Sequence, residues 1–271
     1  MNDLGAFSSL IKALAPWQTQ VVLVGGWAHR LHRLHPLAGN PDYQPLMTRD
    51  VDIAFADRPP LKGDIKSALL EAGFAEELFG EDRPPVTHYT LGNSDEGFYA
   101  EFLTPQTGSG IKRNKEPDST KLAAGITAQK LRHLEILLSE PWSIAVGPSE
   151  GFPLDKATIV QVANPVAFVA QKLLIQHARR PEKRAQDTLY IHDTLELFGA
   201  ELAALHDLWT TRILPELSKK DVRGIRESAD QNFSAVTDII RDAARIPADR
   251  QLFPERIQQL CQAVLAEILA E

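Results

Sequence analysis

The sequence predicts an α/β (α+β) domain at residues 1–164, followed by an all-helical domain at residues 165–271. In the first part, short β-branched or alternating runs typical of strands are interleaved with stretches whose apolar residues recur at helical spacing. After Pro165 almost every apolar residue falls in a helical pattern, and proline itself suits the first position of a helix. We therefore place the domain boundary between residues 164 and 165.

Each element of the first domain is predicted from its local pattern. Apolar spacing predicts helices over residues 7–14, 27–34, 64–72 and 127–138. Alternation and β-branching predict strands over residues 21–24 and 51–55, a hairpin of 86–91 with 98–103, and a strand pair of 143–146 with 158–162. Proline, glycine and polar residues predict loops at 36–45 and 106–121.

The second domain is predicted to contain helices only. The same apolar spacing predicts them over residues 166–178, 183–197, 201–217, 220–245 and 254–269. We find neither internal repeats nor low-complexity segments.

Composition excludes several classes of protein. The chain has 271 residues and a net charge of −7, so a basic footprint for nucleic acid over the whole chain is absent. Cys261 is the single cysteine, which excludes an intramolecular disulfide and a cysteine-based zinc site. No segment approaches the roughly 20 apolar residues that span a bilayer, and the N-terminus lacks the pattern of a signal peptide. We expect a soluble, cytoplasmic protein without membrane contact.

Three short motifs carry the strongest indication of chemistry. Gly25 and Gly26 lie between an expected strand and an expected helix, where backbone N–H groups can approach a phosphate closely. Asp50 and Asp52 lie two residues apart on a strand, so their side chains share one face. Glu101 lies on a later strand and supplies a third carboxylate. Oxygen-only ligation of this kind suits Mg²⁺, completed by phosphate oxygens and water.

A second set of charges begins in the first helix of the helical domain. Lys172, Gln176 and Arg179 fall on one helical face, and a lysine with an arginine can clamp a triphosphate. Asp187 could orient one of these cations. The alternative for Lys172 is that it extends its amine from an apolar helix to the surface. For Arg179, Lys183 and Asp187 the alternative is a solvated, charged connection.

Other interpretations stay open beside these. The acidic pair could be a solvated strand end, and the glycines could form only a tight turn. His29, His32 and His35 recur at three-residue spacing and could suggest zinc, but the sequence offers no clear fourth ligand. Amphipathic-helix residues explain them better.

The motifs VVLVGGWAHRL, TRDVDIAF and FYAEFLTP, taken in that order, resemble the nucleotidyltransferase-fold superfamily, which includes DNA polymerase β. The resemblance implies a nucleotidyltransferase core with a mixed sheet. It implies Asp50, Asp52 and Glu101 as ligands of Mg²⁺ or Mn²⁺, with Glu101 near the attacking hydroxyl. It further implies Gly25 and Gly26 as contacts to the nucleotide phosphates.

A longer insertion before the acidic pair, HPLAGNPDYQP, resembles bacterial members related to abortive-infection toxins of toxin–antitoxin systems. Those members also carry Thr or Arg before the acidic pair, and a lysine, an arginine and a basic–acidic pair on later helices. The matching residues here, which the resemblance implies as nucleotide-binding, are Thr48, Arg49, Lys172, Arg179 or Arg180, Lys183 and Asp187. The resemblance ends near residue 198.

The expected function is metal-dependent transfer of a nucleoside monophosphate from a nucleoside triphosphate (NTP) to a hydroxyl. The acceptor stays open among tRNA or other RNA, a protein and a small hydroxylated molecule. The toxin-like resemblance adds an antitoxin as an expected partner. The alternative is a non-catalytic module of the same fold that binds a nucleotide or a partner protein.

Overall fold

The computed structural model describes residues 3–56, 59–80, 85–92, 97–111 and 115–270. Its contacts divide the chain into two compact units. The first unit contains residues 1–28 and 47–163, and the second contains residues 29–46 and 164–271. The stretch 29–46 thus belongs to the helical unit, whereas the sequence patterns predict it in the first domain.

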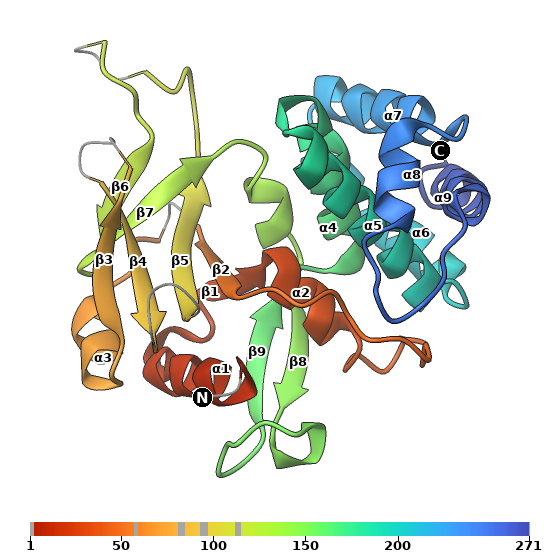
Figure 1. The fold of residues 1–271 in the computed structure, drawn as a ribbon. Helices are drawn as coiled ribbons and strands as arrows, with labels where there is room; N and C mark the ends of the chain where they lie inside the picture. Colours follow the sequence, from red (N-terminus) through yellow and green to blue (C-terminus); the bar gives the residue numbers. More distant parts are fainter. Residues whose placement is uncertain (1–2, 57–58, 81–84, 93–96, 112–114, 271) are drawn as a thin grey trace. The chain divides into compact units, whose positions relative to one another are not determined.

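The first unit is built on a mixed sheet flanked by helices (Figure 1). Its helices are α1 (Asp3–Ala13), α2 (Gly25–His32), which continues into the second unit, and α3 (Ile65–Glu71). Its strands are β1 (Val21–Val24), β2 (Asp50–Phe55), β3 (Ala75–Phe79), β4 (Val86–Leu91), β5 (Phe98–Pro105), β6 (Thr120–Ala123), β7 (Ile126–Leu131), β8 (Trp142–Val146) and β9 (Thr158–Val162).

The strand order is β3-β4-β5-β2-β1-β9-β8, with β7 pairing the far end of β5 and β6 pairing β7. Strand β2 runs parallel to β5 and antiparallel to β1, and β1 runs parallel to β9. The remaining pairs are β3–β4, β4–β5, β6–β7 and β8–β9, which are antiparallel, and β5–β7, which is parallel. The mixed sheet and both strand pairs predicted from the sequence are confirmed.

The two faces of this sheet differ in character. Along β2, Val51 and Ile53 are fully buried, whereas Asp50 and Asp52, which alternate with them, are partly exposed. On the apolar face, Phe98 packs edge-on against Trp27, which stacks on Phe7 of α1 at 4.1 Å. Burial of these rings holds α1 and the start of α2 to one face, and the opposite face carries the acidic side chains.

Two sequence predictions in this unit are wrong. Residues 127–138 do not form a helix: they form β7 followed by the 3₁₀ turn η2 (Glu135–Leu138). Pairing of β7 with both β5 and β6 outweighs the helical spacing of the leucines. Strand β3 lies in a region without an expected element. The end of the 106–121 loop also forms β6; residues 112–114 of that loop, like 93–96 in the hairpin turn, lie outside the described residues.

In its described residues, the second unit consists of helices and loops, which confirms the all-helical prediction after residue 164. The helices are α4 (Pro165–Ile175), α5 (Pro181–Leu197), α6 (Leu202–Leu208), α7 (Lys219–Phe233), α8 (Asp238–Ala244) and α9 (Pro254–Ile268). Short turns also occur: 3₁₀ turn η4 (Gln176–Ala178), π-helical turn η5 (Trp209–Ile213) and 3₁₀ turn η6 (Leu214–Glu216).

Capping residues set where two of these helices begin. Asn164 Oδ1 accepts the Ala167 N–H at 2.8 Å, and Pro165 follows as the first helical residue of α4. Thr237 caps α8 in the same way, so the single expected helix over residues 220–245 is divided into α7 and α8. Among the described residues, no helix has both the length and the apolar character needed to cross a bilayer.

Candidate active site

Strand register brings the three predicted carboxylates onto one face of the sheet. Asp52 lies directly opposite Glu101 in the parallel pair of β2 with β5, and Asp50 lies opposite Tyr99. Laterally paired residues point to the same side, and residues two apart on a strand do as well. Asp50, Asp52 and Glu101 therefore form one partly exposed acidic patch on the face opposite the aromatic core.

Gly25 lies against this patch, where β1 ends and α2 begins. Its φ is +63°, in the left-handed region that favours glycine. A Cβ at this position would overlap Oδ2 of Asp52 and lie 2.9 Å from its Cγ. The missing side chain of Gly25 is thus what leaves room for the Asp52 carboxylate. Gly26 follows inside the first turn of the helix.

The carboxylates of the patch have polar neighbours within the first unit. The Thr48 hydroxyl donates to Oδ1 of Asp50, and Nε2 of His88 lies 3.5 Å from Oε1 of Glu101. Burial, followed by the fields of Asp50 and Glu101, raises the pKa of the Tyr99 phenol well above its usual value. The carboxylates of the patch thus contribute to this shift after burial, and their shared charge sign is the one that a cation site requires.

These carboxylates do not converge tightly. Among the described residues, the group of potential ligands whose atoms all lie within 4.8 Å of one another is found in the second unit and excludes this patch. Asp50 contacts Thr48, and Glu101 contacts His88. The donor set, three carboxylates on one face with a hydroxyl nearby, fits Mg²⁺ or Mn²⁺ by its chemistry.

A row of stacked rings lies beside the patch and was not predicted. Phe79 of β3 stacks on His88 of β4 at 4.2 Å with 22° between the planes. His88 in turn stacks on Tyr99 of β5 at 5.2 Å and 15°. Burial lowers the pKa of His88. The row depends on β3, which the sequence patterns did not reveal, so no sequence signal was available for Phe79.

Arg49, predicted to bind the nucleotide, directly precedes β2 and has an exposed side chain. Its carbonyl accepts the N–H of Tyr99 at 3.2 Å, which extends the β2–β5 pairing by one bond. Gly25 and Thr48 thus lie against the acidic pair, and Arg49 directly precedes Asp50 in the chain.

In the second unit, the structure pairs three of the four charges predicted to hold phosphate. Lys172 Nζ donates to Oδ1 of Asp187 at 2.5 Å, and Nε of Arg179 lies 3.4 Å from Oδ2. Lys172 is only 6% exposed, so the alternative that it extends to the surface is wrong. Lys183 is exposed and bonds to Gln186, apart from this cluster.

Aromatic rings complete the surroundings of the buried amine. Lys172 Nζ lies 4.8 Å from the ring centre of Phe168 and 4.7 Å from that of Tyr190. These distances fit cation–π contacts, which stabilise a desolvated cation. One carboxylate and two rings thus surround the Lys172 amine.

His29 packs against the same rings and is 1% exposed. Burial lowers its pKa to about 3, and neither ring nitrogen has a hydrogen-bond partner among the described residues. His32 stacks edge-on against Phe168, so both histidines lie in an aromatic core. That environment explains them as core residues.

One further acidic cluster has the spacing of metal ligands: His192, Asp193 and Glu196 on α5. Its carboxylates already have cationic partners. Arg250 donates to Asp193 at 2.5 Å, and Arg256 donates to Glu196 at 3.1 Å. We interpret this cluster as an ion-pair network that joins α5 to the first turn of α9 and to the connection before it.

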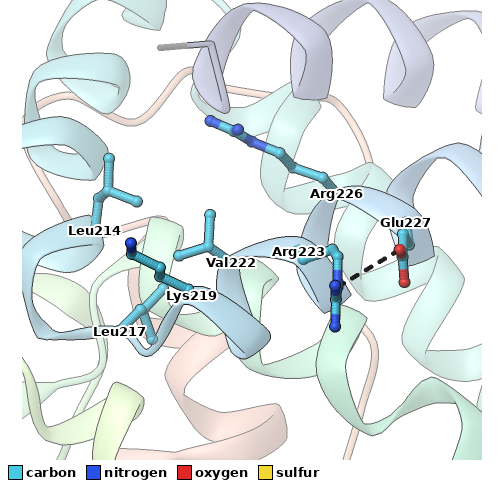
Figure 2. Close-up of a pocket in the computed structure, with 7 residues that line it drawn as sticks. All are labelled: Leu214, Leu217, Lys219, Val222, Arg223, Arg226 and Glu227. Atoms are coloured by element: carbon cyan, nitrogen blue, oxygen red, sulfur yellow. Dashed lines mark ion pairs between the residues drawn. The ribbon is translucent and has the colours of Figure 1, made fainter.

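A hollow of about 400 Å³ lies beside α7 in the second unit (Figure 2). Leu214, Leu217 and Val222 form its apolar part. Lys219, Arg223, Arg226 and Glu227 form its charged part, with Arg223 paired to Glu227 at 3.8 Å. None of the predicted site residues lines it.

Comparison with known proteins places the chain in a family. A search of curated proteins finds no match. Among solved structures, the chain is similar to MenT4, a nucleotidyltransferase toxin of Mycobacterium tuberculosis, with 14% identity over 98% of this chain and 82% of that one and a TM-score of 0.39. A likeness this weak supports no inference about function. A family model described as nucleotidyltransferase matches residues 2–215. Because that match covers well over half of the 271 residues, the chain belongs to the nucleotidyltransferase family.

Proposed function

We propose that this protein is a metal-dependent nucleotidyltransferase that moves a nucleoside monophosphate from an NTP to a hydroxyl of an acceptor. The observation that carries the proposal is the register of β2 with β5, which puts Asp50, Asp52 and Glu101 on one sheet face. Gly25 gives this patch a backbone turn without a side chain at its edge.

Asp50, Asp52 and Glu101 would hold Mg²⁺ or Mn²⁺ through oxygen atoms alone. The bound metal would supply charge stabilisation for the attacking and leaving oxygens during an in-line displacement. The Thr48 hydroxyl, which now donates to Asp50, would keep that carboxylate oriented.

The chain's own residues have separate tasks in the step. The N–H groups that follow Gly25, with Gly26 and Arg49, would bind the triphosphate at the start of α2. The acceptor oxygen forms a bond to the α-phosphorus as the bond to the bridging α–β oxygen breaks, releasing pyrophosphate. Glu101, which the family resemblance places near the attacking hydroxyl, would accept the proton that the hydroxyl loses.

The charges of the second unit form a separate candidate phosphate site. Lys172 and Arg179 would bind phosphate of a nucleotide, with Lys183 as an additional, exposed charge. Asp187 holds Lys172 and lies near Arg179, so it would preset the direction of both cations. A phosphate would have to share Lys172 with Asp187.

The test is transfer of labelled NTPs with Mg²⁺ to a panel of RNA, protein and small hydroxylated acceptors. The paired variants are Asp52→Asn and Asp155→Asn, because Asp155 is an exposed acid of the same unit whose ion pair with Lys12 is long, at 3.7 Å. We expect wild type and Asp155→Asn to transfer label. Asp52→Asn should lower the rate of transfer by at least about 100-fold, which is the loss usually seen when one group that stabilises charge in the transition state is removed. Absence of both transfer and NTP–Mg²⁺ binding in the wild type would refute the proposal.

The rival is a non-catalytic module of the same fold that binds a nucleotide. Thermal shift with each NTP, with and without Mg²⁺, separates the two. Binding that needs no metal and is unchanged by Asp52→Asn favours the module.

The toxin-like sequence motifs extend the proposal to an enzyme that arrests growth and is neutralised by an antitoxin. Inducible expression of the wild type beside Asp50→Ala tests this extension. Equal growth of the two strains removes the toxin interpretation and leaves the transferase proposal intact.

A further inference from the structure

The hollow beside α7 is a surface feature of the second unit that the proposed chemistry leaves unused (Figure 2). Six of its seven lining residues come after residue 215, where the family match ends. Each lining residue is half-buried or exposed, so the hollow is open to solvent along its length. It is therefore a docking surface in shape, and not an enclosed cavity.

Helix α7 presents this surface in a fixed orientation. The Ser218 hydroxyl accepts the Asp221 N–H at 3.1 Å, which sets the first turn of the helix beside the hollow. On another side of α7, the buried Ser228 hydroxyl donates to the Leu173 carbonyl of α4 at 2.7 Å. Positions 219, 222, 223 and 226 recur at helical spacing, so they form one preformed face of α7.

Positive charge borders the apolar part of the hollow. Its lining contains three cations and one acid, whereas the whole chain has a net charge of −7. The acid, Glu227, lies 3.8 Å from Arg223, and their side chains are 61% and 72% exposed. A pair this exposed contributes little, so Arg223 can exchange Glu227 for another carboxylate. Figure 2 shows this pair at one end of the hollow, with Leu214 and Leu217 toward the other.

We propose that this hollow docks an acidic segment of a partner protein, in which one or two large apolar side chains are flanked by carboxylates. The apolar side chains would contact Leu214, Leu217 and Val222, and the carboxylates would pair with Lys219 and Arg223. An apolar patch with a charged rim is typical of interaction sites, and arginine is enriched in them. The inference goes beyond the proposed transferase function and does not depend on it.

Two other classes of ligand fit the hollow less well. Small-molecule sites usually bury about 70–90% of their ligand, which a surface without a fully buried lining residue does not provide. Leucine and valine offer no ring on which a nucleic-acid base could stack, and Glu227 would repel its phosphates. A protein segment can cover the apolar part and meet the cations at the same time.

The test selects a random dodecapeptide library, displayed on phage, against the full-length wild type. Peptides that also bind Arg223→Glu are removed, and the affinities of the remaining peptides are measured by fluorescence anisotropy. We expect these peptides to carry aspartate or glutamate beside a large apolar residue. Lys219→Glu and Leu217→Ala, which took no part in the selection, should each weaken their binding about tenfold. Added salt should weaken it further.

Each variant has a matched control in the same unit. Lys220→Glu makes the same charge change at an exposed lysine that does not line the hollow. Leu202→Ala truncates a half-buried leucine away from it. Both controls should bind the selected peptides as the wild type does. Lys219→Glu places an acid in the first turn of α7, where the helix dipole favours it, so this variant should fold.

The absence of acidic peptides after selection refutes the proposal, and so does equal weakening by Lys219→Glu and Lys220→Glu. Dodecanoate and a labelled oligoribonucleotide are tested on the same proteins. If one of these loses binding with Lys219→Glu and the acidic peptides do not, the hollow binds a fatty acid or a nucleic acid and the partner-protein assignment is wrong. None of these measurements uses label transfer, so their failure is distinguishable from failure of the transferase proposal.

Discussion

Replacing Gly25 by alanine perturbs the backbone and the acidic patch together. The backbone effect is a loss of stability. Gly25 has a φ of +63°, where an L-residue costs about 1–2 kcal/mol relative to glycine. The effect on the acidic patch comes from the new Cβ, which would overlap Oδ2 of Asp52 and come within 2.9 Å of its Cγ. The Asp52 carboxylate must rotate away, since the opposing atoms of Gly25 belong to the main chain. We expect the affinity for Mn²⁺ to fall about 10- to 100-fold, the range found when a metal ligand loses its orientation.

The variant Gly73→Ala separates the backbone effect from the effect on Asp52. Gly73 also has a positive φ, of +89°, but a Cβ there would meet only Cδ1 of Leu91 at 3.8 Å, an ordinary contact. Both variants should lower the melting temperature, and only Gly25→Ala should weaken metal binding. Isothermal titration with Mn²⁺ and scanning calorimetry on the three proteins measure both effects. If the two variants bind Mn²⁺ equally well, the claim that Gly25 makes room for a metal-binding Asp52 is refuted.

Three further predictions concern the second unit. Asp187→Asn should lower the free energy of unfolding of that unit by about 3–5 kcal/mol, because it removes the buried counter-ion of Lys172. Adding Lys172→Met should recover most of this loss. Chemical denaturation of wild type, single variant and double variant measures both effects. His29 is buried with its pKa lowered to about 3, so its contribution to stability is complete above about pH 6.5 and is lost as the pH falls toward 3, at about 1.4 kcal/mol per pH unit. His29→Phe should flatten this acid dependence of unfolding, and an unchanged slope would contradict the assignment. Arg250→Met should lower the melting temperature of the unit, because Asp193 is 1% exposed at its side chain and loses its guanidinium partner; a melting temperature equal to wild type would show that the pair is dispensable.

The sheet positions that carry the acids could be predicted because they depend on local alternation. Residues two apart on a strand share a face whatever the rest of the fold does, so Asp50 and Asp52 were fixed by the pattern alone. Glu101 followed from the hairpin pattern of its strand. Its register against Asp52 depends on the parallel pairing of β2 with β5, which no local pattern contains.

The elements that were predicted wrongly or missed depend on strand partners distant in sequence. Residues 126–131 gain two strand neighbours, β5 and β6, and this pairing outweighs a spacing of leucines that would suit a helix. Strand β3 contains two adjacent glutamates and pairs with β4 along its whole length. Only that pairing brings Phe79 to His88, so the ring row could not be found from the sequence. In the same way, periodicity placed Lys172 on a helix face but could not show that α5 would cover it.

The acidic and basic groups of the proposed chemistry share one property that bears on affinity. Asp50 accepts from Thr48, Glu101 lies beside His88, and Lys172 is held by Asp187. A metal or phosphate that binds these groups would therefore replace one polar contact by another. The binding free energy would be only the difference between the two contacts. This favours moderate affinities for each ligand alone. Metal and nucleotide should bind more tightly together than alone. Phosphate oxygens complete the coordination shell of the metal, and the metal offsets the repulsion between the acids and the triphosphate. Titrations should accordingly show Mg²⁺ and NTP each strengthening the binding of the other by the same factor, as linkage requires.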